Sequence, residues 1–279
     1  MDPSLRSNGS NTRPAISTRP PSTRSRVAAK VERVVNTALG GDKAAVLNAT
    51  APELLADPEG VAQTLAAALD RQGAGVTAHW LIHEMLRRSS LQDELLDALA
   101  SPDPTTRAAA ARICGAARLT ESAMWISDLV NDPAPRVREA AVRSLAQLGG
   151  RRAVDEIMAS ADTIPLHRLA IALSKAASDV DIEALMRQPA SERAAVATVL
   201  ACGLRRDVLR VSPLLGIAHD RRWPKQVRFA ACRALAMIGD RSAADGLHRL
   251  AEKDGDADIQ KAARRAHRRV LRRAVGRPR

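Results

Sequence analysis

The feature that most constrains the fold of this chain is an internal repeat. Residues 137–149 read VREAAVRSLAQLG and residues 227–239 read VRFAACRALAMIG, with Val, two Arg, two Ala, Leu, Ala and Gly in the same register. The first Arg of this block recurs at intervals of about thirty residues, and Gln260 takes its place in a last copy. It stands at five positions (Arg107, Arg138, Arg168, Arg193 and Arg228). Self-similarity at this period is typical of stacked helical hairpins, each buried only against its neighbours.

Within a copy, the small and apolar residues form one stripe of a helix. In the first block they fall at i, i+3, i+4, i+8 and i+11 (Val137, Ala140, Ala141, Leu145 and Leu148). Pro-containing breakers at 101–104 and 131–135 precede the helices, and Gly149 and Gly239 follow them, where a helix C-terminus favours Gly. The pattern predicts an all-α fold, a right-handed α-solenoid of five to six helical hairpins.

The expected organisation has four parts. They are a disordered basic N-terminal tail at 1–25, a divergent helical region at 26–90, the repeats at 91–271 and a basic C-terminal tail at 272–279. The helices expected in the divergent region span 27–39, 42–48, 58–70 and 76–88. The N-terminal tail is Arg- and Ser-rich like a transit peptide, but its Pro residues and Asp2 favour a plain tail that cannot offset its ordering entropy.

The net charge of +12 is concentrated at the two ends, and the body of the chain is nearly neutral. No apolar run is long enough to cross a bilayer. The three Cys lie inside repeat helices without paired spacing, which favours buried thiols in a reducing compartment. We therefore expect a cytoplasmic protein, and the excess of Arg over Lys suggests a bacterial source.

A short helix, a Pro/Asp turn and a second helix that ends at Gly resemble HEAT repeats, specifically the short bacterial kind related to the phycobilisome-lyase HEAT-like group. The resemblance covers 91–271 and is most specific at 131–149 and 220–239, but loose at 151–203. It implies that the second helices line the concave face. It also implies that the recurrent Arg and the Asp of the preceding turn form a ladder between repeats.

Two positions match that ladder and two do not. Asp132 and Asp162 precede Arg138 and Arg168 by six residues, whereas Ser101 and Arg187 stand at the corresponding sites before Arg107 and Arg193. The ladder is therefore expected to be incomplete. Arg138 and Arg228 are expected to be partly buried.

One histidine pair is a candidate metal site. His79 and His83 lie one helical turn apart and Glu84 follows, a spacing that can chelate a metal ion. HEAT-like deoxyhypusine hydroxylase carries several His-Glu dyads around a di-iron centre, and this chain has one such dyad. Because a lone pair supplies too few ligands, the expectation is no metal, no cofactor and no catalytic residue.

An arginine row on the second helices is the candidate partner surface. Arg112, Arg143, Arg233 and Arg265 occupy one repeat position, which holds Leu173 and Thr198 in the middle copies. Arg143 and Arg233 are expected to be exposed. Phe229 and Met237 stand at two further outward positions, and exposed apolar groups there would anchor a partner.

A second candidate surface is the basic stretch at 200–235. Its members are Arg205, Arg206, Arg210, Arg221, Arg222, Trp223, Lys225, Arg228 and Arg233. A loop Trp amid Arg could stack on a base or hold a phosphate-bearing partner, or it could seal the turn against the next repeat. In the last helix, Arg pairs recur every four residues and suit a polyanion or an anionic membrane surface, although the outer face of a terminal repeat must also be polar.

These patterns favour a non-enzymatic scaffold or adaptor that binds a protein partner on its concave face. The alternative is a nucleic-acid-binding module that uses the 200–235 stretch and the Arg-rich C-terminus. A HEAT-like chromophore lyase or DNA glycosylase ranks third, because no catalytic residue can be named.

Overall fold

The structure, a computed structural model, describes residues 25–42, 44–70 and 75–275. Over these residues the chain forms α-helices and short 3-10 turns, with no strand. The predicted all-α solenoid is confirmed. No helix in the described part is long and apolar enough to cross a membrane.

Six hairpins make up the described repeats, each with a first and a second helix. The first helices are α5 (Leu91–Leu99), α7 (Ala123–Asp128), α9 (Gly150–Ala159), α11 (Asp179–Arg187), α13 (Val211–His219) and α15 (Ala244–Lys253). The second helices are α6 (Pro104–Ala116), α8 (Pro135–Leu148), α10 (Leu166–Ala176), α12 (Glu192–Arg205), α14 (Lys225–Ile238) and α16 (Ala257–Val275). Before them come α1 (Arg26–Leu39), α2 (Ala51–Ala56), α3 (Pro58–Leu69) and α4 (Gly75–Arg88). The 3-10 turns are η1 (Thr120–Ser122), η2 (Leu129–Asn131), η3 (Val208–Arg210) and η4 (Arg241–Ala243).

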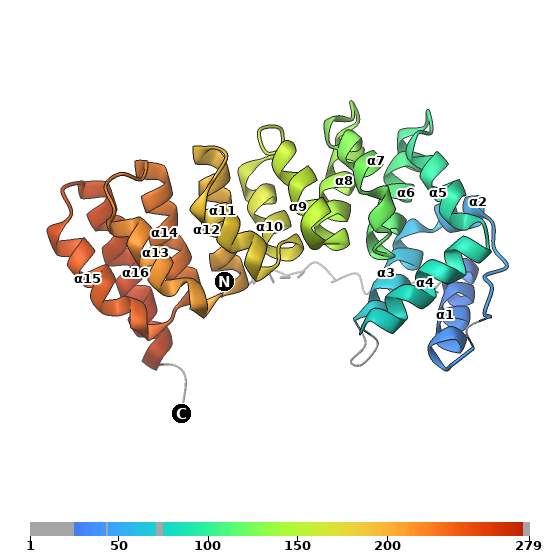
Figure 1. Cartoon of the computed structure of the whole chain (residues 1–279), viewed down its shortest axis with the longest axis horizontal. Coiled ribbons are helices and arrows are strands. Elements are labelled where there is room, and N and C mark those ends of the chain that lie inside the picture. Colours follow the sequence, from blue (N-terminus) through green and yellow to red (C-terminus); the bar gives the residue numbers. More distant parts are fainter. Residues whose placement is uncertain (1–24, 43, 71–74, 276–279) are drawn as a thin grey trace, which may run out of the picture.

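The hairpins stand side by side in a curved array (Figure 1). The second helices pack closely on one another from α6 to α16, and α3 continues their row beyond α6. The first helices touch one another much less. Because the inner side of a curved stack has the shorter spacing, the second helices form the inner row and the first helices the outer row.

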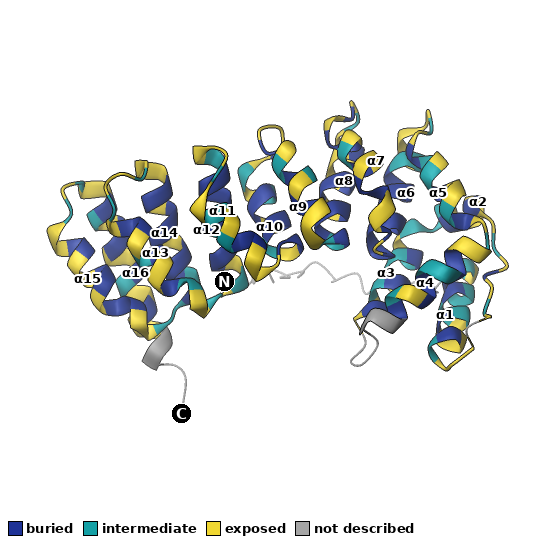
Figure 2. Cartoon of the chain, viewed as in Figure 1, coloured by how far each residue is buried: buried dark blue, intermediate teal, exposed yellow. Residues whose placement is uncertain are grey.

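The core is a series of thin seams between neighbouring helices. The predicted stripe residues Val137, Ala141 and Leu145 are fully buried, and buried positions line the contacts between helices throughout the array (Figure 2). At two seams the approach is close enough to need Gly. A Cβ on Gly115 would lie 2.6 Å from the Cα of Ser144, and one on Gly203 would lie 2.8 Å from the Cα of Ala234.

The prediction of a helix at 42–48 is wrong. The carboxylate of Asp42 accepts the N–H of Ala44 at 2.9 Å, which stabilises a turn. Leu47 is buried, and its N–H donates to Ser89 Oγ at 3.1 Å, outside any helical ladder. The helix begins only after Thr50, whose side chain forms a capping box with Glu53.

The last helix overlaps the segment assigned to the basic C-terminal tail. α16 runs past residue 271 to Val275, into the segment predicted as the basic tail 272–279. Residues 276–279 lie outside the described residues, as do residues 1–24 of the predicted N-terminal tail.

Candidate functional site

Hollows on the inner row form one continuous groove across α3, α6, α8 and α10. Two adjoining hollows between α8 and α10 have volumes of about 260 and 370 Å³ and share Glu139, Val142 and Arg168. Further hollows open toward α6 and α3. The charged residues that line this inner groove are Asp70, Arg112, Arg118, Arg136, Arg138, Glu139, Arg143, His167, Arg168 and Lys175.

The inner groove has an apolar floor and basic walls. Ile171 is 43% exposed on the floor, beside Val142 and Ala172. Glu139 is shared by two arginines, since its carboxylate lies 3.6 Å from Arg143 and 3.5 Å from Arg168.

Positive charge is left over after these pairs are formed. The second groove carboxylate, Asp70, lies 3.6 Å from the guanidinium of Arg118. Among the described residues, Arg136 and Lys175 form no ion pair. The groove therefore combines apolar contact area with an excess of cations, as a site for an acidic polypeptide segment requires.

The predicted arginine row is only partly formed. Arg143 is exposed in the groove, as expected, and Arg112 is half-buried at its α6 end. Leu173 and Thr198, at the equivalent positions of α10 and α12, are buried, so the row does not continue through the middle repeats. The remaining members lie on α14 and α16 and are exposed, but no groove hollow includes them (Arg233 and Arg265).

The ladder between repeats exists, but its acid comes from the following turn. Arg107 makes a bidentate pair with Asp132, at 2.8 Å from Nε to Oδ2 and 3.0 Å from Nη2 to Oδ1, and the hydrogen bond from Arg107 lowers the pKa of Asp132. Arg228 is buried and pairs with Asp254 of its following turn through Nη2, while its Nε donates to the carbonyl of Ala218 at 2.9 Å. A carboxylate about one repeat after the Arg is the sequence signal that identifies this partner.

The predicted pairs of this ladder are wrong. Arg138 is exposed, contrary to expectation, and donates to the main-chain carbonyls of Asp132 and Pro133 at 2.8 and 2.9 Å. The carboxylate of Asp132 is already held by the preceding repeat. Asp162 is exposed, and Arg168 pairs with Glu139 instead.

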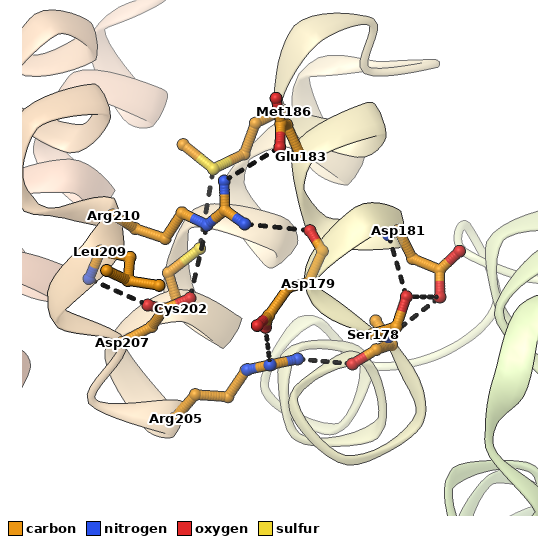
Figure 3. A network of polar contacts seen from close by, with 11 residues as sticks. Ser178, Asp179, Asp181, Glu183, Met186, Cys202, Arg205, Asp207, Leu209 and Arg210 are labelled. Carbon is orange, nitrogen blue, oxygen red and sulfur yellow. Dashed lines mark hydrogen bonds and ion pairs between the residues drawn. The ribbon is translucent and has the colours of Figure 1, made fainter.

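The basic stretch at 200–235 does not form one free surface, because internal acids take up most of its charge. Figure 3 shows Arg205 with Asp179, and Arg210 with the Asp179 carbonyl and the carboxylates of Asp207 and Glu183. The pairs in the rest of the stretch are Arg222 with Asp220, Lys225 with Asp256 and Asp258, and Arg228 with Asp254.

The unpaired members of the stretch are few. Arg206, Arg221 and Arg233 are exposed and have no ion pair among the described residues. Trp223 is half-buried and packs against the core, which is the turn-sealing alternative. Phe229 is 40% exposed on α14, whereas Met237 is half-buried.

Of the three candidate metal ligands, the imidazoles of His79 and His83 lie together, whereas the Glu84 carboxylate is engaged elsewhere. The Nε2 atoms of His79 and His83 lie 3.1 Å apart, and both face the carbonyl oxygen of Arg118. Glu84 instead pairs with Arg87 and Arg88, whose hydrogen bonds lower its pKa to about 2. In the described part of the chain, no three His, Cys, Asp or Glu side chains gather as metal ligands.

Sequence reasoning missed most of the groove. His167, Ile171 and Lys175 were not singled out, because α10 lies in the loose copy of the repeat where register could not be assigned from identity. Arg136 was not singled out either, because it stands on α8 one residue before the repeated block at 137–149. The expected position of the second helices on the concave face could have identified these residues. Residues that point away from the core on neighbouring second helices then lie side by side.

The family model for HEAT repeats matches residues 93–176. The match includes the specific block at 131–149 and reaches into the stretch where the resemblance was loose. The recognition of HEAT repeats in the sequence is confirmed.

Among curated proteins none matches this chain. Solved structures that match include human deoxyhypusine hydroxylase in complex with glycerol, with 17% identity, 88% of this chain and 97% of that chain covered, and a TM-score of 0.35. An engineered protein matches with 20% identity, 87% and 96% of the two chains covered, and a TM-score of 0.28.

Proposed function

We propose that this chain, whose residues 93–176 are HEAT repeats, is a non-enzymatic scaffold that binds an acidic segment of a protein partner in its inner groove. The observation that carries the proposal is the charge left over on an apolar-floored groove. Arg136 and Lys175 face it without a carboxylate partner among the described residues, and Ile171 is exposed on its floor.

The contacts in the groove suit a segment that alternates acidic and apolar residues. An apolar side chain on Ile171 would remove apolar area from water, at about 25 cal/mol per Å². Carboxylates of the bound segment could form hydrogen-bonded ion pairs with Arg136 and Lys175. Neither residue would first have to give up an ion pair with a carboxylate of this chain. Positive walls would also speed the encounter with an acidic partner, an effect that weakens with salt.

A fluorescein-labelled synthetic peptide of alternating Glu and Leu tests this proposal by fluorescence anisotropy. The double variant Arg143→Glu/Lys175→Glu should weaken binding about tenfold or more, since adverse charges in an interface cost several kcal/mol. The matched control is Arg152→Glu/Arg249→Glu, which changes the net charge equally at two exposed residues of the outer row. Equal affinity for wild type and the groove variant, or equal loss in both variants, would contradict the proposal.

A specific observation also supports the polyanion alternative. The exposed face of α16 carries arginines that form no ion pair among the described residues (Arg265, Arg268, Arg269 and Arg272). If these arginines bind phosphates, the affinity for an unrelated DNA duplex should fall steeply with salt, and replacing all four by Gln should flatten that dependence. Tight duplex binding at physiological salt, together with no binding of the acidic peptide, would favour this alternative over the scaffold.

A further inference from the structure

Three electron-rich atoms converge where the end of α6 meets α4. His79 and His83 lie one turn apart on α4, and their rings meet edge to face with centroids 4.6 Å apart. Their Nε2 atoms are 3.1 Å from each other and 3.0 and 3.1 Å from the carbonyl oxygen of Arg118. Arg118 has a left-handed backbone (φ 54°) just after α6, an uncommon conformation for a residue other than Gly.

Hydrogen bonds cannot account for all three contacts. Each Nε2 carries at most one proton, and the carbonyl oxygen carries none. If both Nε2 atoms are protonated, both donate to Arg118 and their two hydrogens oppose each other. If only one is protonated, the lone pair of the other nitrogen faces the lone pairs of the carbonyl. In every protonation state one contact near 3 Å is repulsive.

We propose that these three atoms bind a divalent transition-metal ion, with Zn²⁺ as the best match. A cation on the face of the triangle is attracted by all three lone pairs, which removes the conflict. Donors that bind tetrahedral zinc at about 2.0–2.1 Å lie about 3.3–3.4 Å from one another, a few tenths of an ångström above the separations of 3.0–3.1 Å here. Imidazole nitrogen suits zinc, copper and nickel better than calcium or magnesium.

The surroundings fit such an ion. The Glu121 carboxylate lies 3.9 Å from Nδ1 of His83, on the ring nitrogen that a ligand histidine normally directs to a carboxylate. That pairing favours a proton on Nδ1 and leaves Nε2 free to coordinate. Both histidines are half-buried and Arg118 is exposed, so an ion can enter from solvent and keep a water as its fourth ligand.

Thiols of the described chain do not compete for the ion. Cys114, Cys202 and Cys232 are buried and free, and burial raises the pKa of each thiol, to about 12, 11 and 12 respectively. They therefore stay protonated at neutral pH, and metal binding in the folded protein reports on the histidines.

Calorimetric titration of the full chain with ZnCl₂ at about pH 7.5, above the usual histidine pKa, tests the site. Wild type should bind one ion with micromolar or better affinity, and His79→Gln or His83→Gln should each weaken binding about tenfold or more. Glu84→Gln should bind zinc like wild type, because Glu84 is held by Arg87 and Arg88. Circular dichroism of each variant shows whether it is folded.

Nitrogen-15 NMR of the histidine rings in wild-type protein provides a second measurement that needs no variant. Zinc should shift the Nε2 resonances of His79 and His83 and leave those of His248 and His267 unchanged. The latter pair is the matched control, with tilted rings 5.5 Å apart. Absence of stoichiometric binding, unchanged affinity in either histidine variant, or a shift at the control pair would overturn the proposal. None of these outcomes bears on peptide binding in the inner groove.

Discussion

Adding one methyl group at Gly203 should destabilise the protein, whereas the same change at Gly216 should stabilise it. Gly203 faces α14 across a close seam in the C-terminal half. A Cβ there would lie 2.8 Å from the Cα, 3.1 Å from the Cβ and 3.3 Å from the carbonyl oxygen of Ala234. Two of these three atoms belong to the main chain, which cannot move away as a flexible side chain can. At Gly216, in α13, a Cβ would meet no atom within 4 Å.

The expected magnitudes follow from two opposing effects. Ala is favoured over Gly inside a helix by about 0.8–1.0 kcal/mol, and this is the whole effect at Gly216→Ala. At Gly203→Ala, overpacking costs about 1–3 kcal/mol, because α12 and α14 must separate by several tenths of an ångström. We expect a net loss of up to about 2 kcal/mol in the free energy of unfolding.

Guanidinium unfolding followed by circular dichroism at the helix band measures both changes on the same scale. The shift in midpoint at an unchanged slope gives the difference in stability. A stabilising effect of similar size in both variants would refute the close approach of the second helices, and with it the assignment of the inner row.

Three other predictions concern the seams and the ladder. Leu235→Ala should lower stability by about 2–5 kcal/mol, since it empties a fully buried position, and an effect below 1 kcal/mol in thermal unfolding would contradict this. Arg228→Ala should cost about 3–5 kcal/mol by leaving Asp254 buried without its partner, whereas exposed Arg233→Ala should cost less than about 0.5 kcal/mol; equal losses would be inconsistent with the ladder. Because Arg107 lowers the pKa of Asp132 in the folded state, the pair stabilises the protein above the usual Asp pKa and this contribution is lost as the pH falls through the lowered value. Asp132→Asn should therefore be less stable than wild type near neutral pH and lose less stability between about pH 5 and 2, and identical acid titrations of stability would contradict that role.

The fold followed from the sequence because it depends on local spacing. Val137, Ala141 and Leu145 share a helix stripe, and the same stripe recurs at Val227 and Leu235, so burial could be assigned without knowing which helices meet. The failed helix at 42–48 marks the limit of that reasoning. There, Leu47 is held by a contact with Ser89, which is distant in sequence.

The candidate site was less predictable because it depends on register between repeats. Leu173 and Thr198 hold the same repeat position as Arg143, yet both are buried. Their helices lie in copies whose sequences differ from the block repeated at 137–149 and 227–239. The partner of Arg107 was likewise sought in its own turn, although the acid belongs to the next repeat. In the same way, the third atom beside His79 is a main-chain carbonyl, which no side-chain motif can reveal.

Site-specific photo-crosslinking can locate the bound peptide on the inner or the outer row of helices. The photoreactive residue p-benzoylphenylalanine would replace Ile171, on the groove floor, or Val180, which is 75% exposed on α11 in the outer row. With the labelled Glu/Leu peptide, we expect a crosslinked adduct from position 171 that Arg143→Glu/Lys175→Glu removes, and little or no adduct from position 180. Equal or stronger crosslinking from position 180 would contradict the proposal that the inner groove is where this scaffold binds its partner.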